Sequence, residues 1–277
     1  MAINANRAEF EAADIMRGLY GDGIISLSQA FAPGFADRMH DEIMALFDEA
    51  RAIPAGTLPR GPERWYVEVH AERISGFVEI VSHPWFVAVC EAVLTRDYRI
   101  VEVGFDIPFP GAVDQPWHRD FAMPAATVRD RRLNSLAFNL TTIDTKPEHG
   151  PFEIAPGTQW DTFEGCAKGM FPPRDLWSRY EQRAQRKMPQ RGDISARSAL
   201  TVHRGTANRS QSPRPVLVIG VDAPDATNCE RHDLQATRAY HAALPSHIRD
   251  HLHCRIVDTL QPVIQNHMIE GLLVPAY

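Results

Sequence analysis

The sequence lacks the cysteine spacings and the long apolar runs that mark several protein classes. Its four cysteines, Cys90, Cys166, Cys229 and Cys254, are widely separated and form no Cys-x-x-Cys pair. Such scatter is typical of reduced structural thiols and argues against a disulfide framework or a zinc knuckle. No apolar run approaches the length that spans a bilayer, and the N-terminus has no basic segment followed by an apolar one. We therefore expect no membrane partner and a cytoplasmic location.

Positive charge is not in excess. The chain has 29 lysines and arginines against 35 aspartates and glutamates, which gives a formal net charge of −6. With this balance the chain has no excess of positive charge to bind a polynucleotide, so we expect no nucleic-acid partner. The apolar residues make up 44% of the 277 residues, which is enough for a sizeable core, and no linker, repeat or low-complexity tract interrupts them. We expect one domain over residues 1–277. Its oligomeric state is not indicated by the sequence.

The first third of the chain, residues 1–97, is expected to form a mainly helical layer with a few strands. Apolar residues recur at helical spacing over residues 6–23, 32–51 and 82–94. Ser82 is expected to be the N-cap of the last of these helices, because serine at that position satisfies a free backbone N–H.

Between residues 98 and 225 the pattern changes to short β-rich runs separated by glycine and proline. Such runs predict a barrel or sandwich rather than a parallel βαβ sheet, so the expected fold class is mainly β with flanking helices. A helical insertion is expected around residues 172–187, and residues 226–277 are expected to be helical or irregular. The β-rich runs are YRIVEVGFDIPFPG, LNSLAFNLTTID, GPFEIAPGT, GDISARSALTVHRG and RPVLVIGVDAP.

The first motif with chemical content is QPWHRDFAMP, residues 115–124. On a strand, residues i and i+2 point to the same face, so His118 and Asp120 would present an imidazole and a carboxylate side by side. Two ligands of one metal ion have this arrangement. A half-buried histidine beside a surface acid is the alternative, and the pair alone does not distinguish the two.

A third candidate ligand, His203, lies far downstream in SALTVHRGTANRSQSPRPVLVIGV, residues 198–221. Two histidines and one carboxylate form the facial triad of Fe(II) oxygenases, which leaves open positions for O₂ and a co-substrate. The common co-substrate 2-oxoglutarate has a distal carboxylate that an arginine can bind through two parallel hydrogen bonds. Arg214 follows His203 by eleven residues and begins the next apolar run, so it suits that role.

These motifs together resemble the phytanoyl-CoA dioxygenase family of Fe(II)/2-oxoglutarate oxygenases. The resemblance extends over residues 101–225 and implies a double-stranded β-helix, the cupin-like jelly roll, with the metal at its mouth. It implies that the two histidines and Asp120 hold iron and that Arg214 holds the C5 carboxylate of 2-oxoglutarate. The segments that carry the resemblance are WHRD, TTIDTKPEHGPFEIAPGTQW, RGDISARSALTVHRGTANRS and Arg214.

Further co-substrate contacts are expected from residues near the triad. Asn139 and Thr141 alternate toward one face of a predicted strand and are candidates to line the co-substrate site, although ordinary strand polarity explains them equally well. In some family members, a hydroxyl two residues after the distal histidine touches the co-substrate. This chain has Gly205 at that position, with Thr206 next to it as a candidate.

The resemblance implies a dioxygenase that hydroxylates a small-molecule substrate and releases succinate and CO₂. Halogenating relatives replace the carboxylate of the triad with a small residue, so Asp120 favours hydroxylation, or a related desaturation or ring closure. Two alternatives remain: a cupin-like zinc or manganese hydrolase with the same triad, and a silent small-molecule binding protein. A rival metal site at His247 and His251 lacks a third ligand, so we interpret it as a solvated helix face.

Overall fold

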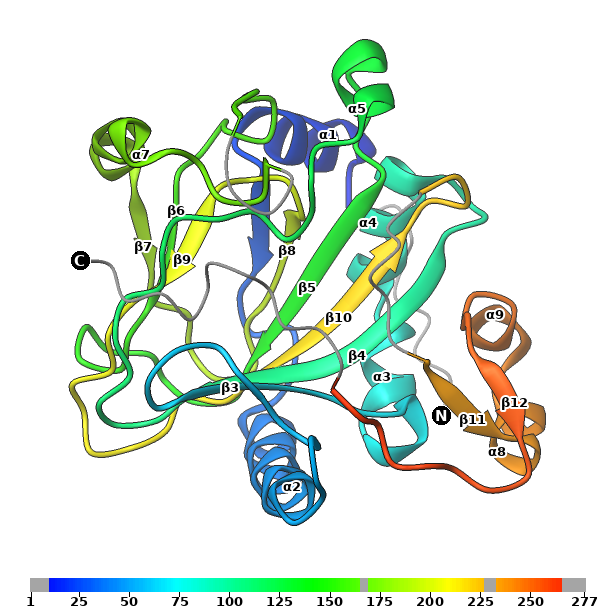
Figure 1. Ribbon diagram of the computed structural model, residues 1–277. Coiled ribbons are helices and arrows are strands. Elements are labelled where there is room, and N and C mark those ends of the chain that lie inside the picture. Colours follow the sequence, from blue (N-terminus) through cyan, green and yellow to red (C-terminus); the bar gives the residue numbers. More distant parts are fainter. Residues whose placement is uncertain (1–9, 165–168, 227–232, 266–277) are drawn as a thin grey trace.

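The computed structural model describes residues 10–164, 169–226 and 233–265 of the chain. Two antiparallel sheets, one large and one small, form its centre, and helices cover one face of the large sheet (Figure 1). The predicted fold class, mainly β with flanking helices, is confirmed. No helix in the described ranges combines the length and the apolar character needed to cross a membrane.

The large sheet has seven strands in the order β1, β8, β5, β10, β4, β3, β2. All of its neighbouring strands are antiparallel. Its strands are β1 (Ile24–Leu27), β2 (Leu58–Pro59), β3 (Arg64–Glu68), β4 (Arg99–Pro108), β5 (Ser135–Thr141), β8 (Ile194–Ser198) and β10 (Val216–Asp222).

The small sheet has three strands in the order β7, β6, β9, again antiparallel. These strands are β6 (Phe152–Ile154), β7 (Gln185–Lys187) and β9 (His203–Gly205). A separate parallel pair, β11 (Gln235–Thr237) with β12 (Arg255–Val257), lies near the C-terminal end of the described chain.

The longest helices, α1, α2 and α4, pack against the large sheet. Residues of α1, α2, α3 and α4 share one hydrophobic core with the sheet. The helices are α1 (Ala12–Gly21), α2 (Pro33–Arg51), α3 (Phe77–Val81), α4 (Pro84–Leu94), α5 (Ala125–Asp130), α7 (Trp177–Arg183), α8 (Arg238–Ala243) and α9 (Ser246–Arg249). The described residues also contain the 3₁₀ turns η2 (Ala71–Arg73) and η3 (Arg174–Leu176).

Successive side chains of the central strands point alternately into the hydrophobic core and toward the site. In β5, Phe138 is buried with the helices and stacks on Phe86 of α4 at 4.1 Å between ring centroids. Its neighbours Ala137 and Asn139 point to the other face, where they line a hollow between the two sheets. Because successive side chains of a strand point to opposite faces, one strand serves both the core and the site.

The helix α4 begins one residue later than the sequence predicted. His83, and not Ser82, is its N-cap, and the His83 ring accepts a hydrogen bond from the backbone N–H of Trp85 at 3.2 Å. The residue before a proline is driven to extended backbone, and Pro84 therefore places His83 at the cap. Ser82 instead caps the C-terminus of α3.

The predicted helical insertion also ends early. Its helix α7 stops at Arg183, and residues 185–187 form β7, which pairs with β6. Ala184 adopts extended backbone between the two elements and so terminates the helix. The C-terminal segment, expected to be helical or irregular, contains two helices and also the β11–β12 pair.

Replacing Phe138 by alanine should lower the free energy of unfolding by about 3–5 kcal/mol, because it leaves a cavity in the main core. Phe138 is only 1% exposed. Urea denaturation followed by circular dichroism measures the loss. The matched variant Val113→Ala removes an apolar side chain that is 44% exposed, and it should change stability by less than about 0.5 kcal/mol. Equal losses in the two variants would contradict this account of the core.

Candidate metal centre and active site

The two histidines are brought together by a backbone pairing between a loop and a strand. His118 lies on an irregular segment, and His203 begins β9. Each donates its N–H to the carbonyl of the other, at 2.9 Å and 2.8 Å, in an isolated antiparallel bridge. Side chains of such a pair point to the same face, and the two imidazole centroids are 4.4 Å apart. The segment that carries His118 and Asp120 is not a regular strand, so the side-by-side arrangement considered for a strand is reached here through an isolated bridge at His118.

The motif PGTQ, residues 156–159, braces the strand that carries the distal histidine. The Thr158 hydroxyl donates to the Ala155 carbonyl at 2.7 Å and accepts from the N–H of Val202 at 2.9 Å. The Gln159 amide donates to the Tyr20 carbonyl at the end of α1 at 2.9 Å. These bonds fix the backbone directly before His203 and tie it to the helical layer.

Both imidazoles are oriented by the backbone. His118 Nδ1 lies 2.8 Å from the Pro116 carbonyl, and His203 Nδ1 lies 2.8 Å from the Thr201 carbonyl. A carbonyl oxygen only accepts, so each Nδ1 carries the proton and each Nε2 keeps its lone pair. A metal-binding histidine has this arrangement, with one nitrogen held by the protein and the other bound to the metal.

Burial keeps these histidines neutral. It lowers the pKa of His118 to about 4, and it lowers the pKa of His203 well below its usual value, with the positive charge of Arg197 acting in the same direction. At neutral pH neither imidazole is protonated. A metal ion therefore meets two free lone pairs and displaces no proton.

Asp120 is ionised in the same site. Burial alone would raise the pKa of its carboxyl group, but Arg197 and the two histidines outweigh burial and lower that pKa to about 2. Arg197 donates to both carboxylate oxygens, at 2.5 Å to Oδ2 and 3.1 Å to Oδ1.

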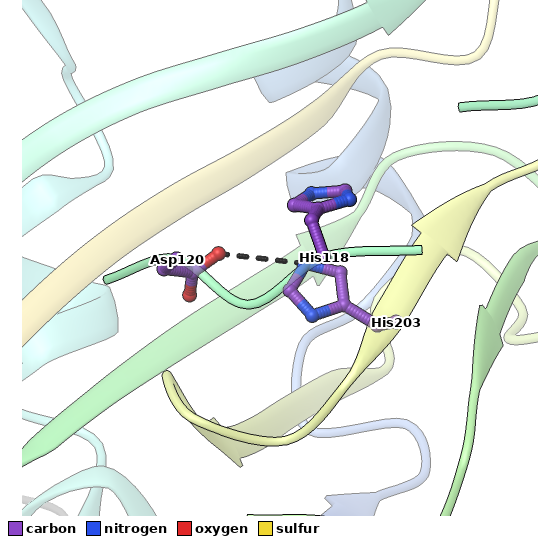
Figure 2. A group of neighbouring side chains, drawn as sticks. All are labelled: His118, Asp120 and His203. Carbon is purple, nitrogen blue, oxygen red and sulfur yellow. Dashed lines mark ion pairs between the residues drawn. The ribbon is translucent and has the colours of Figure 1, made fainter. Parts of the chain in front are cut away.

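The triad fits a metal ion. Figure 2 shows His118, Asp120 and His203 converging, and one ligand atom from each lies within 4.8 Å of the others. Asp120 Oδ1 is 3.4 Å from His203 Nε2. Ligand atoms on one face of an octahedral ion stand about 3 Å apart when each bond is about 2.1 Å. A small inward shift of these side chains therefore suffices, and two nitrogens with one oxygen are a donor set that Fe(II) accepts.

The triad opens into a hollow of about 1200 Å³, part of which is open to solvent. Arg214, two residues before β10, lines this hollow and also a neighbouring one of about 940 Å³. In the described part of the chain, its side chain makes one hydrogen bond, from Nε to the His149 carbonyl at 3.2 Å. Burial lowers the pKa of Arg214 to about 10, so the guanidinium stays charged at neutral pH and is suited to an anionic ligand.

The other predicted co-substrate residues divide into two groups. Asn139 lines both hollows, and its buried Oδ1 has no hydrogen-bond partner among the described residues, so it is available to a ligand. Thr141 lines the smaller hollow only. Thr206 is not brought to either, because its hydroxyl donates to the Pro151 carbonyl at 2.6 Å.

Gly205 makes room for a second buried arginine. A Cβ atom at Gly205 would lie 2.1 Å from Nη1 of Arg64. That guanidinium pairs with Asp106 at 3.0 Å and donates to the Thr206 carbonyl at 2.9 Å. Arg64 therefore occupies the space that a larger residue at position 205 would need, which explains why the hydroxyl found there in some relatives is missing.

Sequence reasoning missed Arg197 and Arg64. The one available signal was a charged residue within an apolar β-rich run, as in ISARSAL, because such a residue needs a buried partner. The rival histidines do not share a solvated helix face, because α9 ends at Arg249. His247 contacts the Ser82 hydroxyl at 3.3 Å, and His251 stacks on Tyr98 at 3.8 Å between ring centroids.

Comparison with known proteins gives one family and several related structures. Residues 19–216 match the family model of phytanoyl-CoA dioxygenase. No curated protein sequence matches the chain significantly. A crystal structure of SnoK, a non-heme alpha ketoglutarate dependent carbocyclase from nogalamycin biosynthesis, is 16% identical, with a TM-score of 0.63 over 80% of this chain and 87% of SnoK.

Two structures of EctD from S. alaskensis are similar too. The form with bound Fe is 16% identical, with a TM-score of 0.63 over 80% of this chain and 79% of EctD. The form with 2-oxoglutarate and 5-hydroxyectoine is 14% identical, with a TM-score of 0.61 over the same shares, 80% and 79%. These likenesses confirm the predicted double-stranded β-helix.

Replacing Gly205 by alanine should displace the Arg64 guanidinium, since a Cβ atom has no room beside it. We expect a loss of about 1–3 kcal/mol in the free energy of unfolding, measured by urea denaturation. The control Gly34→Ala adds a Cβ atom at a position with no atom within 4 Å, so its stability should not fall. A Gly205→Ala variant as stable as the wild type would show that Arg64 moves away without cost.

Proposed function

The chain belongs to the phytanoyl-CoA dioxygenase family of Fe(II)- and 2-oxoglutarate-dependent oxygenases, and on that premise we propose that it hydroxylates a small-molecule metabolite. The co-products are succinate and CO₂. The observation that carries the proposal is the convergence of His118, Asp120 and His203 beside a hollow that also contains Arg214.

The triad residues would hold the iron through His118 Nε2, His203 Nε2 and an oxygen of Asp120. Together with 2-oxoglutarate and O₂, iron supplies the oxidising power that breaks a C–H bond of the substrate. The protein contributes orientation, because each ligand is fixed by its own backbone or side-chain hydrogen bonds. It also shields the two nitrogen ligands from bulk solvent, because both histidines are less than 10% exposed, at 8% and 4%.

Arg214 is the proposed anchor for the C5 carboxylate of 2-oxoglutarate. Its guanidinium is buried and charged, and in the described chain no carboxylate forms an ion pair with it. Asn139, with its unpartnered Oδ1, and Thr141 are the proposed polar contacts along the co-substrate. Thr206 is not retained in this role.

Polar residues in the lining of the hollow favour a polar substrate. Tyr66 and Glu68 of β3 and Glu102 of β4 line it, and the Tyr66 hydroxyl donates to the Glu102 carboxylate. A hydrocarbon chain would leave these groups desolvated without new hydrogen bonds, at a cost in binding free energy. We therefore propose a polar metabolite as the substrate.

The intact carboxylate of Asp120 favours hydroxylation over halogenation, as the sequence indicated, since it occupies the position that a halide would need. A zinc or manganese hydrolase would use the same triad but would have no use for the buried charge of Arg214. Recovered metal identity and consumption of 2-oxoglutarate separate these functions, and neither consumption nor metal binding is expected of a silent binding protein.

Anaerobic addition of Fe(II) and 2-oxoglutarate to the wild-type protein should produce the weak visible charge-transfer band of an iron-bound keto acid. The variant His203→Ala should lose this band, because one of three ligands is missing. An exposed histidine provides the control, and His253→Ala should retain the band. No band in the wild type, with zinc recovered instead, would favour the hydrolase.

Replacing Arg214 by glutamine should raise the Kd for 2-oxoglutarate by at least about 30-fold, since a buried, hydrogen-bonded charge pair is worth about 2–5 kcal/mol. Titration of the same visible band measures this Kd, and Fe(II) affinity should change little. Arg209→Gln removes an exposed arginine five residues upstream and should leave the Kd unchanged. An unaltered Kd in Arg214→Gln would place the anchor elsewhere.

A further inference from the structure

One arginine beside the triad has no assigned role. Arg197 of β8 forms a two-pronged ion pair with Asp120, from Nη1 to Oδ2 at 2.5 Å and from Nη2 to Oδ1 at 3.1 Å. We propose that Arg197 is a positioning residue that fixes the Asp120 carboxylate so that one oxygen, Oδ1, is presented to the metal. This inference rests on the proposed function, because it assumes that the triad binds a metal ion.

Asp120 needs such support because its backbone hydrogen bonds do not orient its carboxylate. The residue lies on an irregular segment, and the nearest backbone restraint is the bond from its N–H to the Ala199 carbonyl at 2.9 Å. Its side chain has two rotatable bonds, so the carboxylate plane is not defined by the backbone. The two histidines differ in this respect, since a carbonyl oxygen fixes each ring.

Arg197, in contrast, is held firmly. Its strand is paired on both sides, with Arg197 opposite Ile24 of β1 and Ala137 of β5. The side chain is 9% exposed, and its guanidinium lies 5.7 Å from the centre of the Phe152 ring, which belongs to the small sheet. Because the large sheet holds this planar guanidinium in place, its two hydrogen bonds fix the orientation of the Asp120 carboxylate.

The two oxygens of Asp120 are not equivalent. Oδ2 takes the shorter bond to Arg197, whereas Oδ1 takes the longer one and lies 3.4 Å from His203 Nε2, on the side of the histidines. With Oδ2 engaged by arginine, the carboxylate offers a single oxygen to the metal. Single-oxygen binding keeps the protein at three ligands and leaves three positions of an octahedral ion for the keto acid and O₂.

Arg197 has two opposing effects on metal binding: its positive charge repels the metal ion, and its hydrogen bonds orient the Asp120 carboxylate. The positive guanidinium repels a divalent cation, so its removal would strengthen metal binding if electrostatics decided the outcome. Loss of the carboxylate orientation would weaken metal binding instead, as loss of outer partners of metal ligands commonly does. The proposal states that orientation outweighs repulsion, and the sign of the change in affinity decides between the two.

The test is the Kd for Mn(II), measured anaerobically from the electron paramagnetic resonance signal of the free ion, for the wild-type chain and for Arg197→Gln. We expect the variant to bind Mn(II) about 10- to 100-fold more weakly. The control Arg186→Gln breaks another arginine–carboxylate pair, Arg186 with Glu153 at 2.7 Å, away from the triad, and should leave the Kd unchanged. A Kd for Arg197→Gln equal to or below that of the wild type would overturn the proposal.

A second variant separates orientation from charge and serves if Arg197→Gln does not fold. Arg197→Lys keeps the positive charge, but an ammonium group cannot bond both oxygens in one plane, so Mn(II) affinity should stay reduced by about tenfold. Wild-type affinity in Arg197→Lys would show that charge alone is required. Because no turnover is measured, the result is independent of the substrate. Failure of the wild type itself to bind Mn(II) would instead refute the proposed function.

Discussion

The pairing of His118 with His203 is the interaction on which the rest of the site depends. One reciprocal pair of backbone hydrogen bonds joins a loop to the small sheet and places two imidazoles on the same face. The hydrogen bond from Val202 to the Thr158 hydroxyl fixes the strand side of this bridge. The backbone bridge therefore determines where the two imidazoles lie, and they converge because it places them on the same face.

The carboxylate of the triad is oriented by a distant residue, whereas the histidines are oriented by neighbouring backbone. Carbonyl oxygens of Pro116 and Thr201 fix the histidine rings, and these bonds use the same local chain that carries each ring. Asp120 receives its restraint from Arg197, which is 77 residues away in sequence and lies in the large sheet. Iron binding as proposed would thus depend on both sheets, which explains why a two-sheet β-helix suits this chemistry.

Much of the fold was predictable from the sequence because alternation and helical spacing are local properties. The runs that contain β4, β5 and β10 were expected, and so were the helical spacing of α2 and the triad residues. The isolated bridge that joins His118 to His203 was not predictable, because one such bridge leaves no alternating pattern that differs from a loop. Arg197 and Arg64 were missed since their partners, Asp120 and Asp106, lie far away in sequence, and only tertiary structure shows such pairs.

The charges of the hollow explain why a dianion is the complementary ligand. Two of the arginines that line it are neutralised, Arg64 by Asp106 and Arg197 by Asp120. Within the residues that the structure describes, the acceptor of Arg214 is neutral, the His149 carbonyl. A divalent metal on the triad would add positive charge beside the Asp120–Arg197 pair. A ligand with one carboxylate for Arg214 and another for the metal neutralises both centres, and 2-oxoglutarate has that pair of groups at its two ends.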